Sequence, residues 1–302
     1  MDYIFSLLTN NQWYLFYLAS IMILSGYAKD LGWFRPAYVW VLANVKSKRM
    51  VVSLISLITG VLPITGRVTV SAGFLDTIAP KDKSKRQVFG IIDYLSTHHY
   101  YLWSPLEKSV ILPMAALGIS YWVFLSYMLP LLIGAFAVIA YYIFGKMSED
   151  DIEIDTSKFN NSDRFIQKNP LIYVNWYAIL MLFVIIILGN FAKGYTEEIT
   201  MFVESNVESI LYVSVISFIG AFILGSSSRF AALTAIGVTV YGIEYLPWFF
   251  ALDYAGYMLS PTHKCLGISK MYFGTPLKDY YTSIGVLCGL LMIIGAITSF
   301  ML

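Results

Sequence analysis

Long runs without charged residues dominate the pattern of this chain. Residues 3–28, 169–192, 209–228 and 280–302 contain no Asp, Glu, Lys or Arg. Each run is close to the roughly 20 apolar residues that an α-helix needs to cross a bilayer. Residues 109–145 form a fifth run that is about twice as long. The pattern predicts helices that cross a membrane.

Two details complete the predicted set of crossings. Pro130 lies near the middle of residues 109–145, and because proline interrupts helices we expect two helices back to back there. Residues 230–252 are interrupted only by Glu244 and are expected to form one more crossing. The chain is therefore predicted to be an all-α polytopic membrane protein with about seven full spans.

Two further apolar segments are too broken to be simple crossings. Residues 50–80 contain Pro63 and Gly66, and residues 253–275 contain Pro261. We expect re-entrant hairpins or broken helices here, because irregular backbone at membrane depth is tolerated only beside protein or a water-filled cavity. For the first segment, one tilted span with a kink is the alternative.

Charge placement divides the chain into two halves. Basic clusters flank the first broken segment, so the positive-inside rule places both of its ends in the cytoplasm and the N-terminus outside. We expect an N-terminal membrane repeat over residues 1–146, an acidic cytoplasmic linker over residues 147–168 and a C-terminal membrane repeat over residues 169–302. This layout is typical of transporters built from inverted repeats.

Composition supports the same class. The chain is 58% apolar and only 13% charged, whereas soluble domains carry about 25% charged residues. A net charge of +1 leaves no basic excess for a phosphate backbone, so nucleic acid is not an expected partner. The expected partner is lipid, and the expected location is the inner or plasma membrane of the cell.

The sequence shows no catalytic motif, and we expect no enzyme, metal site or cofactor, apart from Na⁺ or H⁺ as a coupling ion. Cys265 and Cys288 lack CxxC spacing and are expected to be inert packing residues. His98 and His99 are adjacent, and neighbours in sequence do not share a helix face. An interfacial aromatic belt is the better interpretation of these histidines.

The candidate chemistry lies at the two breaks. Ser260 followed by Pro261 is typical of a helix start, and a helix N-terminus at membrane depth attracts anions. In the first break, Arg67 offers a fixed positive charge that needs a cavity or a partner. The alternative is that Arg67 and His263 are buried and satisfied by backbone carbonyls. The residues expected to bind solute are Thr65, Gly66, Arg67, Ser260, Thr262 and His263, with Pro63 and Pro261 shaping the breaks.

Three titratable residues are candidates for a proton relay near the second break, namely His263, Glu244 and Asp253. Ionisable groups inside membrane segments often carry protons. The alternative for the two carboxylates is a place at the outer interface.

Two stretches of sequence carry a family resemblance. They are the run from Gly73 through IIDYLSTHHYYLWSPLEKSVILPM, and GYMLSPTHKCLGISKMYFGTPLKDYY, whose SPTHKCL is the more specific motif. Both resemble the uncharacterised membrane family numbered four hundred and one among the domains of unknown function, which is grouped with the ion transporter superfamily of citrate, dicarboxylate and arsenite carriers. The resemblance leaves the first helix and the acidic linker unmatched.

The resemblance implies an inverted-repeat fold with two hairpins that meet at a midplane site, and commonly a homodimer. It assigns Pro63, Gly66, Ser260, Pro261 and His263 to the hairpin motifs. Two departures matter, since Arg67 replaces a small residue and the chain is shorter than is usual in the family. The leading hypothesis is a secondary active transporter of a small anionic solute, coupled to protons or sodium. The alternative is a non-transporting membrane scaffold subunit of a larger complex.

Overall fold

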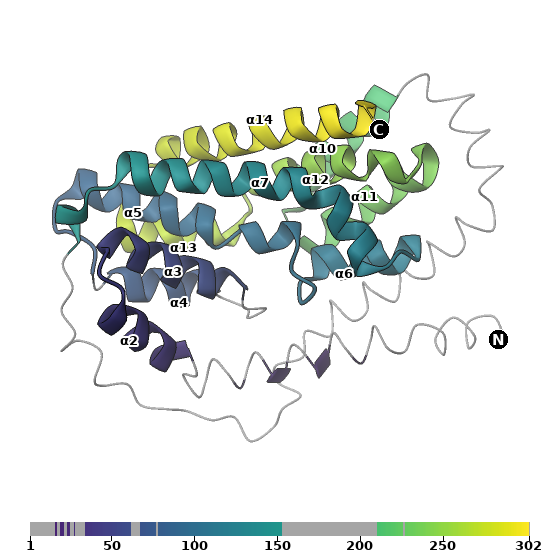
Figure 1. Cartoon of the computed structure of the whole chain (residues 1–302). Coiled ribbons are helices and arrows are strands. Elements are labelled where there is room, and N and C mark those ends of the chain that lie inside the picture. Colours follow the sequence, from purple (N-terminus) through teal and green to yellow (C-terminus); the bar gives the residue numbers. More distant parts are fainter. Residues whose placement is uncertain are drawn as a thin grey trace.

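The computed structural model describes residues 34–61, 67–76, 78–152, 210–225 and 227–301, together with a few positions between 16 and 27. Within these residues all regular secondary structure is helical (Figure 1). The α-helices are α2 (Phe34–Asn44), α3 (Lys48–Val61), α4 (Arg67–Asp76), α5 (Lys83–Ser96), α6 (Lys108–Leu117), α7 (Tyr121–Lys146), α10 (Ile210–Leu224), α11 (Ser227–Tyr241), α12 (Leu246–Leu259), α13 (Lys264–Phe273) and α14 (Leu277–Met301). The short 3-10 helices are η1 (His99–Leu102), η2 (Glu149–Asp151) and η5 (Ile243–Tyr245).

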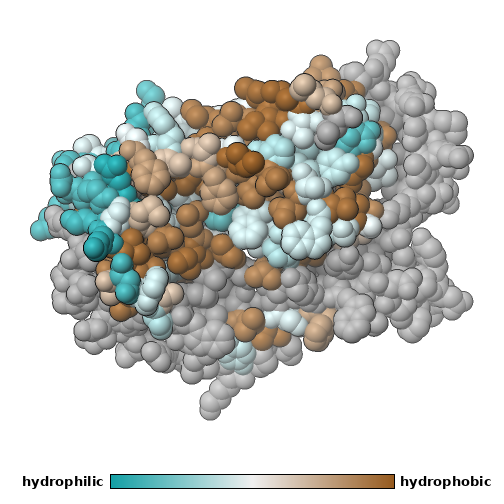
Figure 2. Space-filling model, viewed as in Figure 1, coloured by the Kyte–Doolittle hydropathy of each residue, from teal (hydrophilic) through white to brown (hydrophobic). Residues whose placement is uncertain are grey.

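Two long helices, α7 and α14, lie side by side along the molecule (Figure 1). They contain 26 and 25 residues, which at 1.5 Å per residue gives about 38 Å, more than the roughly 30 Å of a hydrocarbon core. Both expose apolar side chains, including Trp122, Ile133 and Ile293. Figure 2 shows apolar side chains over these helices and hydrophilic ones at the left end of the molecule. These features support membrane association.

Two helices, each of them interrupted, run between the long helices α7 and α14 on one side and α3 and α4 on the other. The first consists of α5, η1 and α6, and the second consists of α12 and α13. α5 packs against α13 in one half of the molecule, whereas α6 and α12 both pack against α11 in the other half (Figure 1). The two interruptions therefore meet near the centre.

The core around these interruptions is aromatic. Tyr94, Phe250, Tyr254 and Tyr280 are fully buried. A buried phenol needs a hydrogen-bond partner, and the hydroxyl of Tyr280 has one in Ser269 Oγ at 2.6 Å. The centre of the molecule thus combines large apolar rings with internal hydrogen bonds.

Local sequence explains several helix ends. Asp82 caps α5, because its carboxylate accepts hydrogen bonds from the backbone N–H groups of Ser84 and Lys85 at 3.0 and 3.1 Å. The Ser84 hydroxyl also donates to Asp82, and these bonds hold the pKa of the carboxyl below its usual range. Gly118 ends α6 with φ of 67°, and Ser120 caps α7. A positive φ of this kind is the reason for glycine at position 118.

The prediction of about seven full spans is wrong. Among the described residues, two helices are long and apolar enough to cross a membrane, α7 and α14. The run at 209–228 forms α10, whose 15 residues extend only about 22 Å. The predicted crossings at residues 3–28 and 169–192 lie largely or wholly outside the described residues, as do most of the predicted linker and Pro63, Thr65 and Gly66.

The predicted helix breaks are also displaced. Pro130 lies inside α7, and the run at 109–145 breaks instead at Gly118 to Ser120, leaving one short and one long helix. The run at 230–252 breaks at Gly242, whose φ is 108°. Hydropathy alone missed both breaks, because each depends on a single glycine with positive φ.

Candidate functional site

A cluster of buried polar side chains occupies the point where the two interruptions meet. α5 ends at Ser96, and its C-cap residue Thr97 donates its hydroxyl to the carbonyl of Asp93 at 2.7 Å. α12 ends because Ser260 precedes a proline and adopts an extended backbone, with φ −61° and ψ 129°. His98 directly follows the first end, and His263 is the N-cap of α13. The sequence therefore places one histidine at each interruption.

The two histidines face each other. Their Nε2 atoms are 3.3 Å apart, and both side chains are buried. His98 Nδ1 is 2.5 Å from the carbonyl oxygen of Tyr94, which only accepts, so this nitrogen carries the proton. His263 Nδ1 is 2.9 Å from the hydroxyl of Tyr94. One tyrosine therefore orients both imidazoles.

Further aromatic rings enclose this pair. The ring of Tyr257 stacks on His263 with centroids 4.2 Å apart, and the ring of Tyr94 stacks on His98 at 4.4 Å. The hydroxyls of Tyr257 and Tyr101 are 2.8 Å apart. Tyr101 thereby connects the histidine pair to Arg67.

Arg67 is the charged member of the cluster. Its Nη2 lies 3.5 Å from Glu107 Oε2 and 3.4 Å from the Tyr101 hydroxyl. The guanidinium carbon is 3.3 Å from the centre of the Tyr100 ring, a cation–π contact. The side chains of Arg67 and Glu107 are only 11% and 4% exposed. Neither charge is well solvated, so each depends on the other.

Two buried oxygens near the Arg67–Glu107 ion pair lack a hydrogen-bond partner within the part of the chain that the structure describes. Glu107 Oε1 and the Tyr100 hydroxyl have no hydrogen-bond partner among the described residues. The Arg67–Glu107 contact is also longer than the 2.7–2.9 Å typical of a charge-assisted hydrogen bond. The contact between Arg67 and Glu107 is consequently a long one for an ion pair.

Two buried carboxylates accompany the interrupted helices. Asp93 on α5 accepts a hydrogen bond from the Ser71 hydroxyl, and Asp253 on α12 accepts one from the Thr234 hydroxyl at 2.5 Å. The second oxygen of each carboxylate is buried and has no partner among the described residues. A buried carboxylate without a cation costs much less when it is protonated or binds an ion.

The solute-binding residues predicted from the sequence are only partly brought together. Arg67 and His263 enter the cluster, as Tyr101 and Tyr257 connect them. Ser260 and Thr262 instead bond to each other, Oγ to Oγ1 at 2.9 Å. The predicted helix start at Ser260 and Pro261 is wrong, because α13 begins at Lys264 and Ser260 ends α12.

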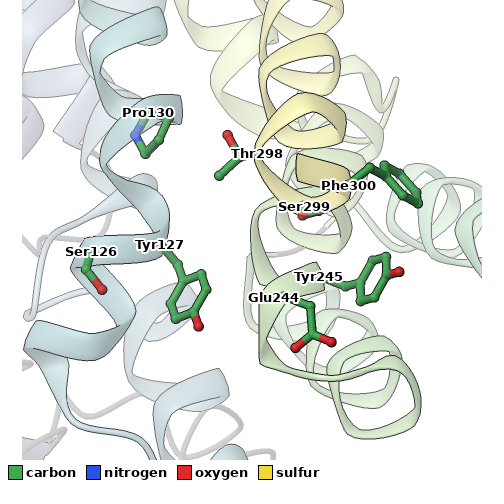
Figure 3. A pocket seen from close by; sticks show the side chains of 8 residues that line it. All are labelled: Ser126, Tyr127, Pro130, Glu244, Tyr245, Thr298, Ser299 and Phe300. Carbon is green, nitrogen blue, oxygen red and sulfur yellow. The ribbon is translucent and has the colours of Figure 1, made fainter. Parts of the chain in front are cut away.

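Of the proton-relay candidates, Glu244 is far from the interruption. It lies one length of α12 away from Ser260, about 20 Å by the helical rise, and lines an open cavity of about 850 Å³. Figure 3 shows Glu244 on one side of this gap and Tyr127 on the other. Pro130 in α7 also lines it, where proline leaves the carbonyl of Ser126 without its helical donor. Glu244 belongs to this cavity and not to the polar cluster.

Sequence reasoning missed most of the cluster, namely Tyr94, His98, Tyr100, Tyr101, Glu107, Tyr257 and Cys265. His98 and His99 are buried, at 0% and 2% exposure, so the interpretation as an interfacial belt is wrong. His98 meets a residue 165 positions away, and spacing within one helix carries no signal for such a contact. Cys265 lies beside both histidines, although it had been interpreted as a packing residue.

A family model agrees with the resemblance seen in the sequence. The model described as "Protein of unknown function (DUF401)" matches residues 2–193. The match includes the first uncharged run and the acidic linker, which the resemblance had left out, and it stops before the motif at Ser260. Neither a curated protein nor a solved structure matches the chain. These comparisons do not support the placement in the ion transporter superfamily.

Proposed function

This chain belongs to the family described as protein of unknown function DUF401, and we propose that it is a secondary active transporter of a small anionic solute. The observation that carries the proposal is the buried polar cluster where two interrupted helices meet. Transporters commonly bind their substrates at such interruptions, because helix ends and freed backbone groups are available there. Burial of the charged side chains of Arg67 and Glu107 costs free energy. A role in substrate binding would explain why the chain has them at buried positions.

In this proposal Arg67 binds the solute and Glu107 takes its place when the site is empty. An anion with two oxygens offers the guanidinium a bidentate partner, which is stronger than the single 3.5 Å contact to Glu107. The Tyr100 hydroxyl is a further donor within the cluster. Solute binding thus exchanges a loose internal ion pair for a better external one.

We assign the coupling ion, a proton or Na⁺, to Asp253. This carboxylate is buried, is held by Thr234 and has one oxygen without a partner among the described residues. It lies seven residues before Ser260 on α12, about 10 Å along the helix. Ion binding at Asp253 would therefore act on the same helix that ends at the cluster.

The hydrophilic end of the molecule gives the proposed orientation. The starts of α3 and α5 and the end of α7 lie at this end (Figure 1), and these three helix termini are Lys48, Lys83 and Lys146. By the positive-inside rule this end faces the cytoplasm of a cell membrane.

Anion binding is the first test. We would measure the melting temperature of the full chain in detergent with citrate, succinate, phosphate or sulfate. A ligand at 100 times its dissociation constant adds about 2.7 kcal/mol of apparent stability. We expect at least one of these anions to stabilise the protein, and Glu107→Gln to bind it about tenfold more tightly because the competing carboxylate is gone. Arg67→Gln combined with Glu107→Gln should abolish the effect without leaving a charge unpaired.

A second ion pair supplies the matched control. Arg86 pairs with Asp76, with side chains 25% and 36% exposed, outside the cluster. Asp76→Asn should leave the anion affinity unchanged. An equal gain in affinity in Asp76→Asn, or full anion binding in the double variant at Arg67 and Glu107, would contradict the assignment.

A membrane scaffold is the second candidate function. It is favoured by the packing of the cluster, in which the histidine, tyrosine and arginine side chains already contact one another at 2.8 to 3.5 Å. A scaffold needs no exchangeable solute. It predicts that no anion stabilises either the wild type or Glu107→Gln.

A further inference from the structure

Three potential metal ligands meet at the crossing of the interrupted helices. They are His98, His263 and Cys265, and their ligand atoms all lie within 4.8 Å of one another. We propose that these three residues bind a zinc ion. The site is distinct from the proposed contact between Arg67 and an anion, and it does not depend on the transport proposal.

The distance between the two imidazoles fits one bridging ion. Zinc binds histidine nitrogen at about 2.0–2.1 Å in a tetrahedral arrangement, which puts two such nitrogens about 3.3–3.4 Å apart. The Nε2 atoms of His98 and His263 are 3.3 Å apart. With a Zn–S bond of about 2.3 Å, the sulfur of Cys265 has to move at most about 1 Å closer to the nitrogens. Cys265 is half-buried in the first turn of α13, so a side-chain rotation is the movement required.

The hydrogen bonds behind the histidines are those of metal ligands. A ligating histidine usually donates its other ring N–H to a backbone carbonyl, a carboxylate or water, which fixes the tautomer. His98 donates from Nδ1 to the Tyr94 carbonyl at 2.5 Å, and its Nε2 therefore carries a lone pair. This nitrogen is directed towards His263.

Tyr94 allows His263 to adopt the matching tautomer. In the metal-free state the Tyr94 hydroxyl donates to His263 Nδ1, and His263 Nε2 donates to His98. When the hydroxyl turns to the Met258 carbonyl, 3.5 Å away, it accepts from His263 Nδ1 instead. Both Nε2 atoms then have lone pairs, which a cation between them would stabilise. Besides the movement of the Cys265 sulfur, zinc binding needs this change of tautomer and the loss of the thiol proton of Cys265, which leaves to solvent.

The ligand types select zinc among common ions. Imidazole and thiolate together suit zinc and not Mg²⁺ or Ca²⁺, which prefer oxygen. Cys265 is the second residue of α13, and a thiol that coordinates a metal ion is deprotonated by the metal itself. Three protein ligands leave a fourth position open for water or another ligand.

Cobalt provides a direct optical test, because Co²⁺ occupies zinc sites and its absorption reports thiolate ligation. We would titrate the metal-depleted full chain in detergent with Co²⁺ and then displace it with Zn²⁺. We expect one Co²⁺ per chain, a thiolate charge-transfer band and loss of that band when Zn²⁺ is added. Cys265→Ser should remove the band, and Tyr94→Phe should weaken binding about tenfold, since loss of an outer hydrogen bond costs about 10–100-fold.

Matched controls exist for two ligands. Cys288→Ser changes the other described cysteine, which is buried in α14, and His99→Gln changes the neighbouring histidine. Both should keep the band. Zn²⁺ should also protect Cys265 of the wild type from alkylation, as mass spectrometry can show without any variant. No thiolate band in the wild type, a band that survives Cys265→Ser, or no protection of Cys265 would each overturn the proposal.

Discussion

Among the described residues, Asp253 and Asp93 are the two carboxylates whose burial is complete, at 0% exposure. Each receives one hydroxyl hydrogen bond, from Thr234 and Ser71 respectively. Neither has a basic partner recorded among the described residues, unlike Glu107 with Arg67. A residue in this situation is held for a reason other than stability, because an apolar or neutral side chain would cost less.

Replacing Asp253 therefore separates stability from function. Asp253→Asn should keep the Thr234 hydrogen bond. It should melt within a few degrees of the wild type, because the substitution breaks no ion pair. Thr234→Val should lower the stability by about 1–3 kcal/mol, because it leaves the carboxylate oxygen unpaired. Thermal unfolding of both variants measures the difference. A large loss in Asp253→Asn would show that the carboxylate is a structural residue.

The sequence identifies some residues of the cluster and misses others. Arg67 and His263 can be picked from the sequence, because a charged or titratable residue beside a helix break is conspicuous. His98, Cys265 and Glu107 cannot, because each becomes part of the cluster only through contacts between distant segments. Packing between α5 and α13 brings His98 and Cys265 together, and Glu107 enters the cluster through Arg67 at the start of α4. No local sequence pattern predicts either contact.

Helix α3 shows how distant segments define an element's end. Glu149 of η2 accepts hydrogen bonds from the backbone N–H groups of Lys48 and Arg49 at 2.6 and 3.2 Å, and also from the Ser47 hydroxyl. The Ser47 hydroxyl, followed by the two N–H groups, lowers the pKa of Glu149. Because the folded pKa is below the unfolded value, near 4.3, the stabilisation is present at higher pH and is lost as pH falls through the folded pKa.

Glu149→Gln should accordingly lower the melting temperature at pH 7 by about 1–2 °C, a small helix-cap effect at an exposed position. The difference from the wild type should shrink as the pH falls below 4. Melting curves between pH 3 and pH 8 would show this, with the exposed neighbour Asp150→Asn as the control. A constant difference across that range would mean that the charge of Glu149 is irrelevant.

The contact between α10 and α12 depends on one glycine. A Cβ on Gly256 would clash with the carbonyl oxygen of Phe218 in α10, so the two backbones touch. Gly256→Ala should destabilise the protein by about 1–3 kcal/mol through overpacking. Gly267→Ala in α13 is the matched control, because nothing lies within 4 Å of the added Cβ; it should gain up to about 1 kcal/mol from helix propensity. Thermal unfolding that ranks the two variants in the opposite order would refute this view of the helix contact.

Element boundaries were predictable where hydropathy alone decides them. The long apolar helix at the C-terminus follows from the sequence, whereas Ser260 and Pro261, which were expected to start a helix, follow the end of α12 instead. The breaks at Gly118 and Gly242 were not predictable, because a glycine adopts positive φ only when its surroundings require it. Pro130 was expected to break a helix, but α7 continues through it.

The whole molecule combines an apolar exterior with a polar centre. Large apolar side chains on α7, α10 and α14 are exposed, among them Ile133, Leu211 and Ile297. Among the described residues, the interior holds an ion pair, three histidines and two further carboxylates. This is the reverse of a soluble domain and is consistent with membrane association. Composition predicts the exterior, but it overestimates the number of full spans because it cannot tell a continuous helix from an interrupted one.

Transport by the purified protein tests the central claim most directly. We would reconstitute the full chain into liposomes and measure uptake of radiolabelled citrate, succinate, phosphate or sulfate, with and without gradients of H⁺ or Na⁺. We expect a gradient of one coupling ion to drive accumulation of at least one of these anions. We also expect the double variant Arg67→Gln and Glu107→Gln to be inactive and Asp253→Asn to lose the response to the gradient. Uptake no faster than into protein-free liposomes, for every anion under every gradient, would contradict the transport proposal and favour the scaffold.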